Sequence, residues 1–255
     1  MPLESTIRVL PPQVAERIAA GEVVERPASV IKELIENSLD AGAQAISVEI
    51  RAGGLKLMRV SDDGIGMRRV DAPLALERFA TSKIQCAADL EHITTLGFRG
   101  EALSSIAAVA HLELLSRTAA ELEGTHVRAS ADLEPSPQVW PAASPVGTSV
   151  TVRGLFYNTP ARRKFLKSPR RETDLVRNTV VRYALAYPNV AMRLMVDGRE
   201  RFVAPPALPM ERIGTCLGRE VAGGMLQMSW SAGELELDGY ISSPSIGRSR
   251  RQGQF

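Results

Sequence analysis

Residues 28–42, ASVIKELIENSLDAG, form the stretch on which the interpretation of this chain depends. Apolar side chains recur in it at the helical period of 3.6 residues, at Ile31, Leu34, Ile35 and Leu39. The opposite side of such a helix carries Glu33, Glu36, Asn37 and Asp40. Pro27 favours a helix start and Gly42 a helix end. The segment predicts an amphipathic helix, either with a solvated acidic face or with a general base and a metal-binding amide turned toward a nucleotide pocket.

The composition is that of an ordinary globular protein. The 255 residues are 44% hydrophobic and 24% charged, and the net charge is +2. A charge this close to zero does not argue for nucleic-acid binding by the whole surface, so a DNA site must be a local patch. Cys86 and Cys216 lie far apart and lack the spacing of a zinc site. The sequence shows no secretory signal and no run of 18 apolar residues, so we expect a soluble cytoplasmic protein.

Periodicity and turn residues divide the chain into alternating elements. Strands are predicted at 45–51, 55–61, 111–117, 124–130, 147–153, 190–196, 199–203, 225–231 and 234–242. Helices are predicted at 13–20, 28–41, 70–80, about 87–92, from within 96–103 to about 109, 170–187 and 210–217. Irregular segments are predicted at 1–12, 133–145 and 243–255.

The segment APPALP at 204–209 is the best linker, since half of it is proline. It divides the chain into an expected first domain at 1–203, which contains the candidate nucleotide-binding motifs described below, and an expected partial second domain at 210–255. A single helix and two strands after the linker are too little for a finished core.

The familiar phosphate motifs are absent, because no Walker sequence occurs and Gly64-x-Gly66 lacks the third glycine of a dinucleotide fingerprint. Asp62-x-Gly64-x-Gly66 still follows a predicted strand. Glycines let a backbone approach a ligand closely, and an aspartate can accept a hydrogen bond from the exocyclic amine of adenine. An ordinary turn at the end of a strand explains these residues equally well.

A second glycine pair, in Gly97-Phe98-Arg99-Gly100, precedes a predicted helix and could present backbone N–H groups to phosphates. Lys83, which follows Thr81 and Ser82, could reach a phosphate, although an isolated surface lysine is the commoner case. Residues 78–103, which we call the lid segment, lack a long apolar period, so we expect them to become ordered on nucleotide binding. Thr148 opens a strand and offers a hydroxyl. Each feature also has an ordinary structural explanation as a cap, turn or surface side chain.

Taken in order, these motifs resemble the nucleotide-binding motifs of the gyrase, heat-shock-chaperone, histidine-kinase and MutL ATPase superfamily. The resemblance implies that Glu33 is the general base, that Asn37 coordinates Mg²⁺ and that Asp62 recognises the adenine of ATP. It also assigns the following residues to the nucleotide: Asn37, Gly64, Gly66, Ser82, Lys83, Gly97, Phe98, Arg99, Gly100 and Thr148.

Four longer blocks narrow the match, and they resemble the signatures of the MutL family of DNA mismatch-repair proteins. They occupy residues 18–43, 78–84, 96–103 and 156–166, and the resemblance runs from about 7 to 240. It implies a two-layer α/β sandwich with a mixed β-sheet and helices on one face. An incomplete second α/β domain of the ribosomal-protein type is expected to follow. Asp63 departs from the family pattern, in which asparagine is frequent.

The resemblance further implies a bacterial, nucleoid-associated repair protein that dimerises on binding ATP. Its expected partners are a mismatch-recognition protein, a helicase and a nicking endonuclease. A lysine of the second domain is implied to contact the γ-phosphate, but the last lysine here is Lys167. We therefore expect weak magnesium-dependent ATP hydrolysis from these 255 residues.

The densest basic cluster is formed by Arg162, Arg163 and Lys164. It predicts contact with the DNA backbone without base specificity, although a solvated charged loop is an equal alternative. Other functions stay open: a nucleotide-gated scaffold with negligible turnover, a protein-kinase relative, or the ATPase half of a type II topoisomerase. The kinase lacks a histidine in the context of a phosphoacceptor helix, and residues 156–163 argue against the topoisomerase.

Overall fold

The structure is a computed structural model of the chain. It describes residues 9, 11, 18, 20, 21, 23–84, 86–132, 137–233 and 235–242. The irregular segment predicted at 1–12 and the helix predicted at 13–20 fall mostly outside these residues, and the irregular segment predicted at 243–255 falls wholly outside them.

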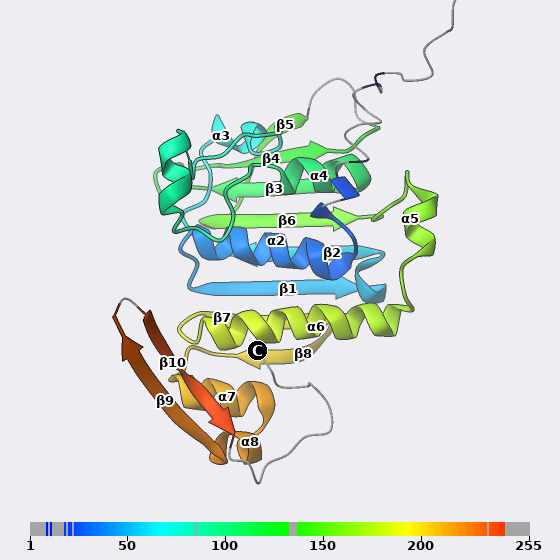
Figure 1. Cartoon of the computed structure of the whole chain (residues 1–255). Coiled ribbons are helices and arrows are strands. Elements are labelled where there is room, and N and C mark those ends of the chain that lie inside the picture. Colours follow the sequence, from blue (N-terminus) through cyan, green and yellow to red (C-terminus); the bar gives the residue numbers. More distant parts are fainter. Residues whose placement is uncertain are drawn as a thin grey trace, which may run out of the picture.

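The core of the fold is an eight-stranded sheet with the order β5-β4-β3-β6-β2-β1-β7-β8 (Figure 1). Its strands are β1 (Ala45–Arg51), β2 (Leu57–Asp62), β3 (His111–Arg117), β4 (Gly124–Ala129), β5 (Gln138–Ala142), β6 (Gly147–Arg153), β7 (Ala191–Val196) and β8 (Arg199–Ala204). β1 pairs with β7 in parallel, and the other neighbours pair antiparallel. The predicted mixed sheet is confirmed.

Helices lie across one face of this sheet (Figure 1). They are α2 (Pro27–Asp40), α4 (Ala102–Val109) and α6 (Pro169–Ala186). The apolar side of α2 is buried at Val30, Ile31, Leu34 and Ile35, and it meets the buried side chains of the central strands. The predicted amphipathic helix and the predicted strand at 45–51 are confirmed at almost the expected bounds. Because one apolar side of α2 packs on the sheet, its opposite, polar side points away from the sheet.

The outward side chains of the sheet are polar and pair across strands. Arg59 of β2 contacts Glu49 of β1 at 3.3 Å and Thr151 of β6 at 3.1 Å. On the neighbouring strands, Arg153 donates to Glu113 at 3.1 Å. An antiparallel sheet commonly buries one face and exposes the other, and burial alternates in this way along β1.

Several short elements differ from the prediction. The helix expected at 70–80 is the four-residue α3 (Asp71–Leu74). After it the chain continues in turns, in which Leu76 donates to the carbonyl of Pro73 and Glu77 to that of Leu74, and Phe79 has a φ of +63° that ends any helix. The segment 133–145, expected to be irregular, contains the edge strand β5, which pairs with β4. The sequence analysis did not predict α5 (Pro160–Lys164) or α8 (Arg219–Gly223). Two further short elements are the 3₁₀ helices η1 (Ala52–Gly54) and η2 (Ala87–His92). The second of these occupies the residues of the helix predicted at about 87–92.

The residues after β8 form α7 (Pro209–Leu217), α8 and a separate two-stranded sheet of β9 (Met225–Ala232) and β10 (Leu235–Ser242). Ala204 belongs to β8 and Pro209 to α7, so the irregular part of the expected linker is shorter than 204–209. No helix among the described residues is both long and apolar enough to cross a membrane.

Arg212 fastens α7 to the rest of the molecule. Its side chain is 1% exposed. The guanidinium donates to the carbonyl oxygens of Ala184 at 2.8 Å, Pro188 at 2.7 Å, Val190 at 2.9 Å and Pro205 at 2.7 Å. Burial lowers the pKa of Arg212, but arginine keeps its charge in proteins. The segment between β8 and α7 is therefore held by one buried cation.

Replacing Arg212 by methionine should destabilise the protein. The substitution leaves buried carbonyl oxygens without their donors, and each such loss costs about 1–3 kcal/mol, so we expect the free energy of unfolding to fall by at least about 2 kcal/mol. Urea unfolding followed by circular dichroism measures it. Arg219→Met on the exposed side of α8 is the control. A loss within about 0.5 kcal/mol, the range of ordinary surface changes, would show that Arg212 does not hold α7.

Candidate nucleotide-binding site

The first cluster of predicted site residues lies at the end of β2, around the carboxylate of Asp62. Its Oδ2 accepts a hydrogen bond from the Ser38 hydroxyl at 2.7 Å. Its Oδ1 accepts from the backbone N–H groups of Gly64 at 3.0 Å and Thr148 at 3.2 Å. The carboxylate is thus fixed by α2, by the loop after β2 and by the start of β6.

The backbone packs so closely beside Asp62 that positions 64 and 66 leave no room for a side chain larger than that of glycine. Gly66 has a φ of +71°, and a Cβ there would lie 2.1 Å from the carbonyl oxygen of Arg117. A Cβ on Gly64 would lie 2.8 Å from the carbonyl oxygen of Ala41. The tight turn that the sequence allowed is therefore present. This structural role of the glycines is compatible with adenine recognition, because the N–H of Gly64 in the same turn binds the carboxylate of Asp62.

Burial affects the chemistry of Asp62. Partial withdrawal from water raises the pKa of its carboxyl, although hydrogen bonds from Ser38, Gly64 and Thr148 oppose the shift. Thr148 also joins the site through its hydroxyl, which lies 2.8 Å from that of Ser116. In its ionised form Asp62 only accepts hydrogen bonds, which suits the exocyclic amine of adenine.

Asp63, the departure from the family pattern, has a local structural role. Its Oδ1 accepts hydrogen bonds from the backbone N–H groups of Gln44 and Ala45, both at 2.8 Å. One oxygen acceptor makes both bonds, and asparagine offers the same oxygen. The substitution therefore leaves the start of β1 anchored.

The second cluster joins the end of α2 to the lid segment. Lys83 Nζ donates to Asp40 Oδ2 at 2.6 Å and to Asn37 Oδ1 at 3.2 Å. Asp40 also accepts from the backbone N–H groups of Leu96 at 2.9 Å and Gly97 at 3.1 Å. The structure therefore brings together three residues that the sequence assigned to the phosphates and the metal, Asn37, Lys83 and Gly97.

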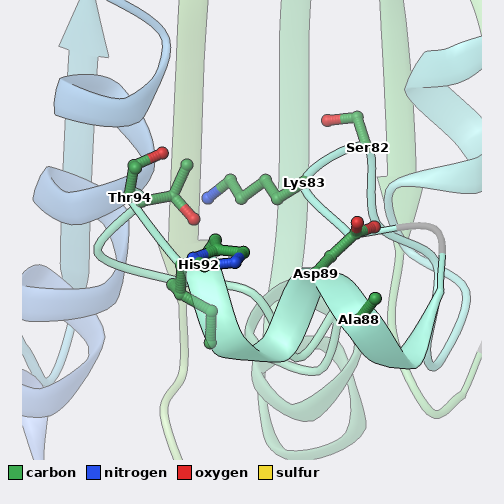
Figure 2. Close-up of a pocket in the computed structure, with 8 residues that line it drawn as sticks. Ser82, Lys83, Ala88, Asp89, His92 and Thr94 are labelled. Carbon is green, nitrogen blue, oxygen red and sulfur yellow. The ribbon is translucent and has the colours of Figure 1, made fainter.

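A cavity of about 420 Å³ opens beside Lys83. In Figure 2 the Lys83 side chain extends across it, above the η2 helix that carries Asp89 and His92 and toward Thr94. Ser82 and Thr95 complete the polar part of the lining. Two of the predicted lid residues, Ser82 and Lys83, thus face one polar cavity.

Backbone contacts hold the two ends of the lid segment together at Gly100. Gly100 has a φ of +63°, and a Cβ there would lie 2.5 Å from the carbonyl oxygen of Ala80, so glycine is required where the two ends of the lid segment meet. Phe79 donates its N–H to the Gly100 carbonyl at 2.9 Å. The Arg99 guanidinium lies 5.7 Å from the centre of the Phe98 ring.

Glu33 lies on α2 one turn before Asn37, and its side chain is 24% exposed. Its Oε1 is 3.0 Å from Lys32 Nζ, which also contacts Glu36 Oε2 at 2.8 Å. The Tyr183 hydroxyl of α6 donates to the other oxygen of Glu36. Burial lowers the pKa of Lys32, but its hydrogen bonds to Glu36 and Glu33 outweigh this effect and raise it. A chain of polar contacts thus runs from α6 to the predicted base.

Asn37 fits the predicted role of a magnesium ligand. Its Oδ1 already faces the ammonium group of Lys83, so this position accommodates a positive charge. The described residues contain no group of three or more His, Cys, Asp or Glu that could hold a metal ion alone. Phosphate oxygens and water would supply the other ligands of Mg²⁺.

The predicted DNA-binding residues lie apart from both clusters, on α5. In Figure 1 this helix stands at one end of the sheet and the lid segment, in teal, at the other. Arg162 is partly buried: it donates to the carbonyl oxygen of Ile18 at 3.2 Å and packs against Gly21. Arg163 and Lys164 are exposed.

Two residues of the clusters were missed by the sequence analysis as site residues, Ser38 and Asp40. Both stand on α2 beside Asn37, so a helical projection of residues 28–42 could have placed them near the site. Their partners could not have been found in this way, because Asp62 and Gly97 are distant in the sequence.

Comparison with known proteins defines the class first. Residues 25–136 match the family described as histidine kinase-, DNA gyrase B- and HSP90-like ATPase. This range contains α2, Asp62 with the turn that follows it, and the whole lid segment, whereas Thr148 lies beyond it.

More similar relatives define the family. The mismatch-repair protein MutL of Desulforudis audaxviator is 49% identical over 249 residues, which is 97% of this chain and 44% of the relative. MutL of Pseudomonas aeruginosa strain LESB58 is 48% identical over 98% of this chain and 40% of the relative. The Aquifex aeolicus MutL ATPase domain, solved in complex with ADP, has a TM-score of 0.63 and 33% identity, covering 82% of this chain and 73% of that one.

The chain therefore belongs to the MutL family of DNA mismatch-repair proteins, and it contains the ATPase domain of that family. The predicted family is confirmed. The chain spans less than half the length of these two curated relatives.

Replacing Asp62 by asparagine should weaken the binding of ADP by about 10- to 100-fold, the effect of losing one charge-assisted hydrogen bond of about 1.5–3 kcal/mol. Guanine nucleotides present an acceptor in place of the amine, so their weak binding should change little. Because burial raises the pKa of Asp62, wild-type affinity for ADP should fall on acidification earlier than an ordinary aspartate would cause. Above this pKa Asp62 is ionised and can accept the hydrogen bond from adenine, and below it the carboxyl is protonated and this acceptor is lost.

Isothermal titration calorimetry across a pH series measures both effects. Asp63→Asn is the matched control, because asparagine can still accept the hydrogen bonds from Gln44 and Ala45. Equal losses for adenine and guanine nucleotides in Asp62→Asn would rule out a role in base recognition.

Proposed function

We propose that this protein is an ATP-binding and ATP-hydrolysing switch of DNA mismatch repair. One observation carries the proposal: side chains of α2 contact both clusters of predicted nucleotide-binding residues. Ser38 binds the predicted adenine-recognising carboxylate of Asp62, and Asn37 contacts the lid lysine Lys83. The ADP complex of the Aquifex relative supports nucleotide binding by this fold.

The proposed chemistry uses the chain's own residues in separate roles. Hydrolysis of a γ-phosphate needs an oriented water, a base and positive charge near the phosphates. Glu33 is the proposed base, held by Lys32 and standing one turn from Asn37. Lys83, Arg99 and the N–H groups of residues 97–100 supply phosphate contacts. Mg²⁺ bound through Asn37 would neutralise charge on the phosphates.

We also propose how the protein assembles and signals. ATP binding is proposed to make the chain dimerise and to signal from a mismatch-recognition protein to a helicase and a nicking endonuclease, at the nucleoid of a bacterial cell. Residues 210–255 are proposed to belong to a second domain of the ribosomal-protein type, joined by a linker at 204–209. The exposed apolar side chains of Leu226, Trp230 and Leu237 on the separate hairpin support a further packing partner there.

Contact with the DNA backbone is proposed for α5. Arg163 and Lys164 are exposed and free to approach phosphates, whereas Arg162 is partly engaged with Ile18. The predicted cluster of Arg162, Arg163 and Lys164 thus divides into one anchoring residue and two surface cations.

Glu33→Ala should bind ATP but hydrolyse it at least ~10²-fold more slowly, the usual contribution of a general base. Nucleotide should then stay bound, so sedimentation velocity in ATP and Mg²⁺ should show a stable dimer. Single-turnover hydrolysis with radiolabelled ATP measures the rate. Glu220→Ala, on the exposed surface of α8, is the control.

Near-normal hydrolysis by Glu33→Ala would remove this residue from the mechanism. Negligible hydrolysis by wild type, with ATP-dependent dimerisation intact, would favour the nucleotide-gated scaffold. A monomer at high concentration with ATP bound would contradict the proposed dimerisation.

Replacing both Arg163 and Lys164 by glutamate should weaken the binding of duplex DNA alike for all sequences. The slope of log affinity against log salt concentration should become shallower by about 2, close to 0.9 for each lost phosphate contact. Fluorescence anisotropy over a salt series measures it, with Arg201→Glu on β8 as the control. An unchanged slope would place the DNA site elsewhere.

A further inference from the structure

The carboxylate of Asp40 binds the donors that a nucleotide phosphate is expected to use. Its side chain is 7% exposed. Oδ1 accepts the N–H of Leu96 at 2.9 Å, and Oδ2 accepts the N–H of Gly97 at 3.1 Å and the ammonium of Lys83 at 2.6 Å. These donors come from both arms of the lid segment, one before η2 and one after it.

The backbone of the lid lies directly on this cluster. A Cβ built on Gly97 would lie 3.5 Å from Lys83 Nζ and 3.9 Å from Asp40 Oδ2. The same ammonium donates to Asn37 Oδ1 at 3.2 Å, so it stands between two polar side chains of α2. The glycine-rich loop is thus drawn toward the end of α2 by one carboxylate.

Carboxylate and phosphate oxygens compete for such donors. Both are anionic acceptors, and both are favoured by a lysine and by the N–H groups of a glycine-rich loop. A backbone N–H makes one strong hydrogen bond, whereas the ammonium of Lys83 offers three donors, two of which are taken by Asp40 and Asn37. A phosphate that takes the N–H groups of Leu96 and Gly97 must therefore release Asp40.

We propose that Asp40 is an internal occupant of the phosphate site: it positions the lid segment in the nucleotide-free protein and competes with the phosphates of the incoming nucleotide. The inference rests on the proposed nucleotide site and adds a residue that opposes binding there. Opening of the Asp40 contacts is then coupled to phosphate occupancy, which ties rearrangement of the lid segment to the presence of nucleotide.

Asp40→Asn removes the charge and keeps the size of the side chain. In the nucleotide-free protein, hydrogen exchange of the amides at 94–98 should rise, because Leu96 and Gly97 lose their anionic acceptor. Calorimetry with Mg-ADP and with a non-hydrolysable Mg-ATP analogue should show about tenfold tighter binding. Asp40→Ser, which is shorter and uncharged, should shift both measurements in the same direction.

Asp71→Asn is the matched control, because Asp71 pairs with Arg68 on the surface of α3, outside both clusters. It should change neither exchange at 94–98 nor nucleotide affinity. Circular dichroism of each variant shows whether it folds.

Each outcome decides the inference. Unchanged exchange at 94–98 in both Asp40 variants would show that the carboxylate does not position the lid. Weaker nucleotide binding by both variants, with wild type binding normally, would overturn the competition and make Asp40 a contributor to the nucleotide site. Absence of nucleotide binding by wild type and all variants would instead contradict the proposed function, whereas the exchange measurement on the empty protein would still report on the lid contact.

Discussion

A carboxylate withdrawn from water must be supplied with hydrogen-bond donors, and this requirement organises the candidate site. Asp62 obtains its donors from α2, from the turn after β2 and from β6. Asp40 obtains its donors from the lid segment. The two carboxylates therefore tie three distant parts of the chain to α2. Asp40 lies on α2 and Asp62 at the end of β2, so the apolar packing of this helix on the sheet fixes the position of each carboxylate relative to the other.

This arrangement suggests how one helix can serve a nucleotide switch. Residues 37, 38 and 40 stand within a single turn, yet they contact the lid segment on one side and the carboxylate of Asp62 on the other. A ligand that replaces the lid contacts would act on side chains fixed to a buried helix, so the lid must move while the helix stays. Differential contacts of this kind are what a conformational switch requires.

The disagreements with sequence-based expectation have a common cause. The helix expected at 70–80 is only four residues long, and the segment expected to be irregular supplies an edge strand, because tertiary packing and strand pairing outweigh local preference in short segments. Arg162 looked like its neighbours in a basic run, but a carbonyl acceptor near residue 18 engages it. Local patterns do not report partners that lie more than a hundred residues away.

The sequence by itself determined the family, the mixed α/β fold, the bounds of α2 and most strands, and the set of residues to examine, because hydrophobic period and long signature blocks are local properties of the chain. Its assignments of Glu33, Asn37, Asp62 and the lid residues remain predictions, now with defined surroundings. The tertiary structure alone decided that Ser38 meets Asp62, that Asp40 holds Lys83 and the lid amides, and that Arg212 fastens α7. These contacts join segments far apart in the chain, and their partners are selected by the burial of polar groups during folding, which no local pattern encodes.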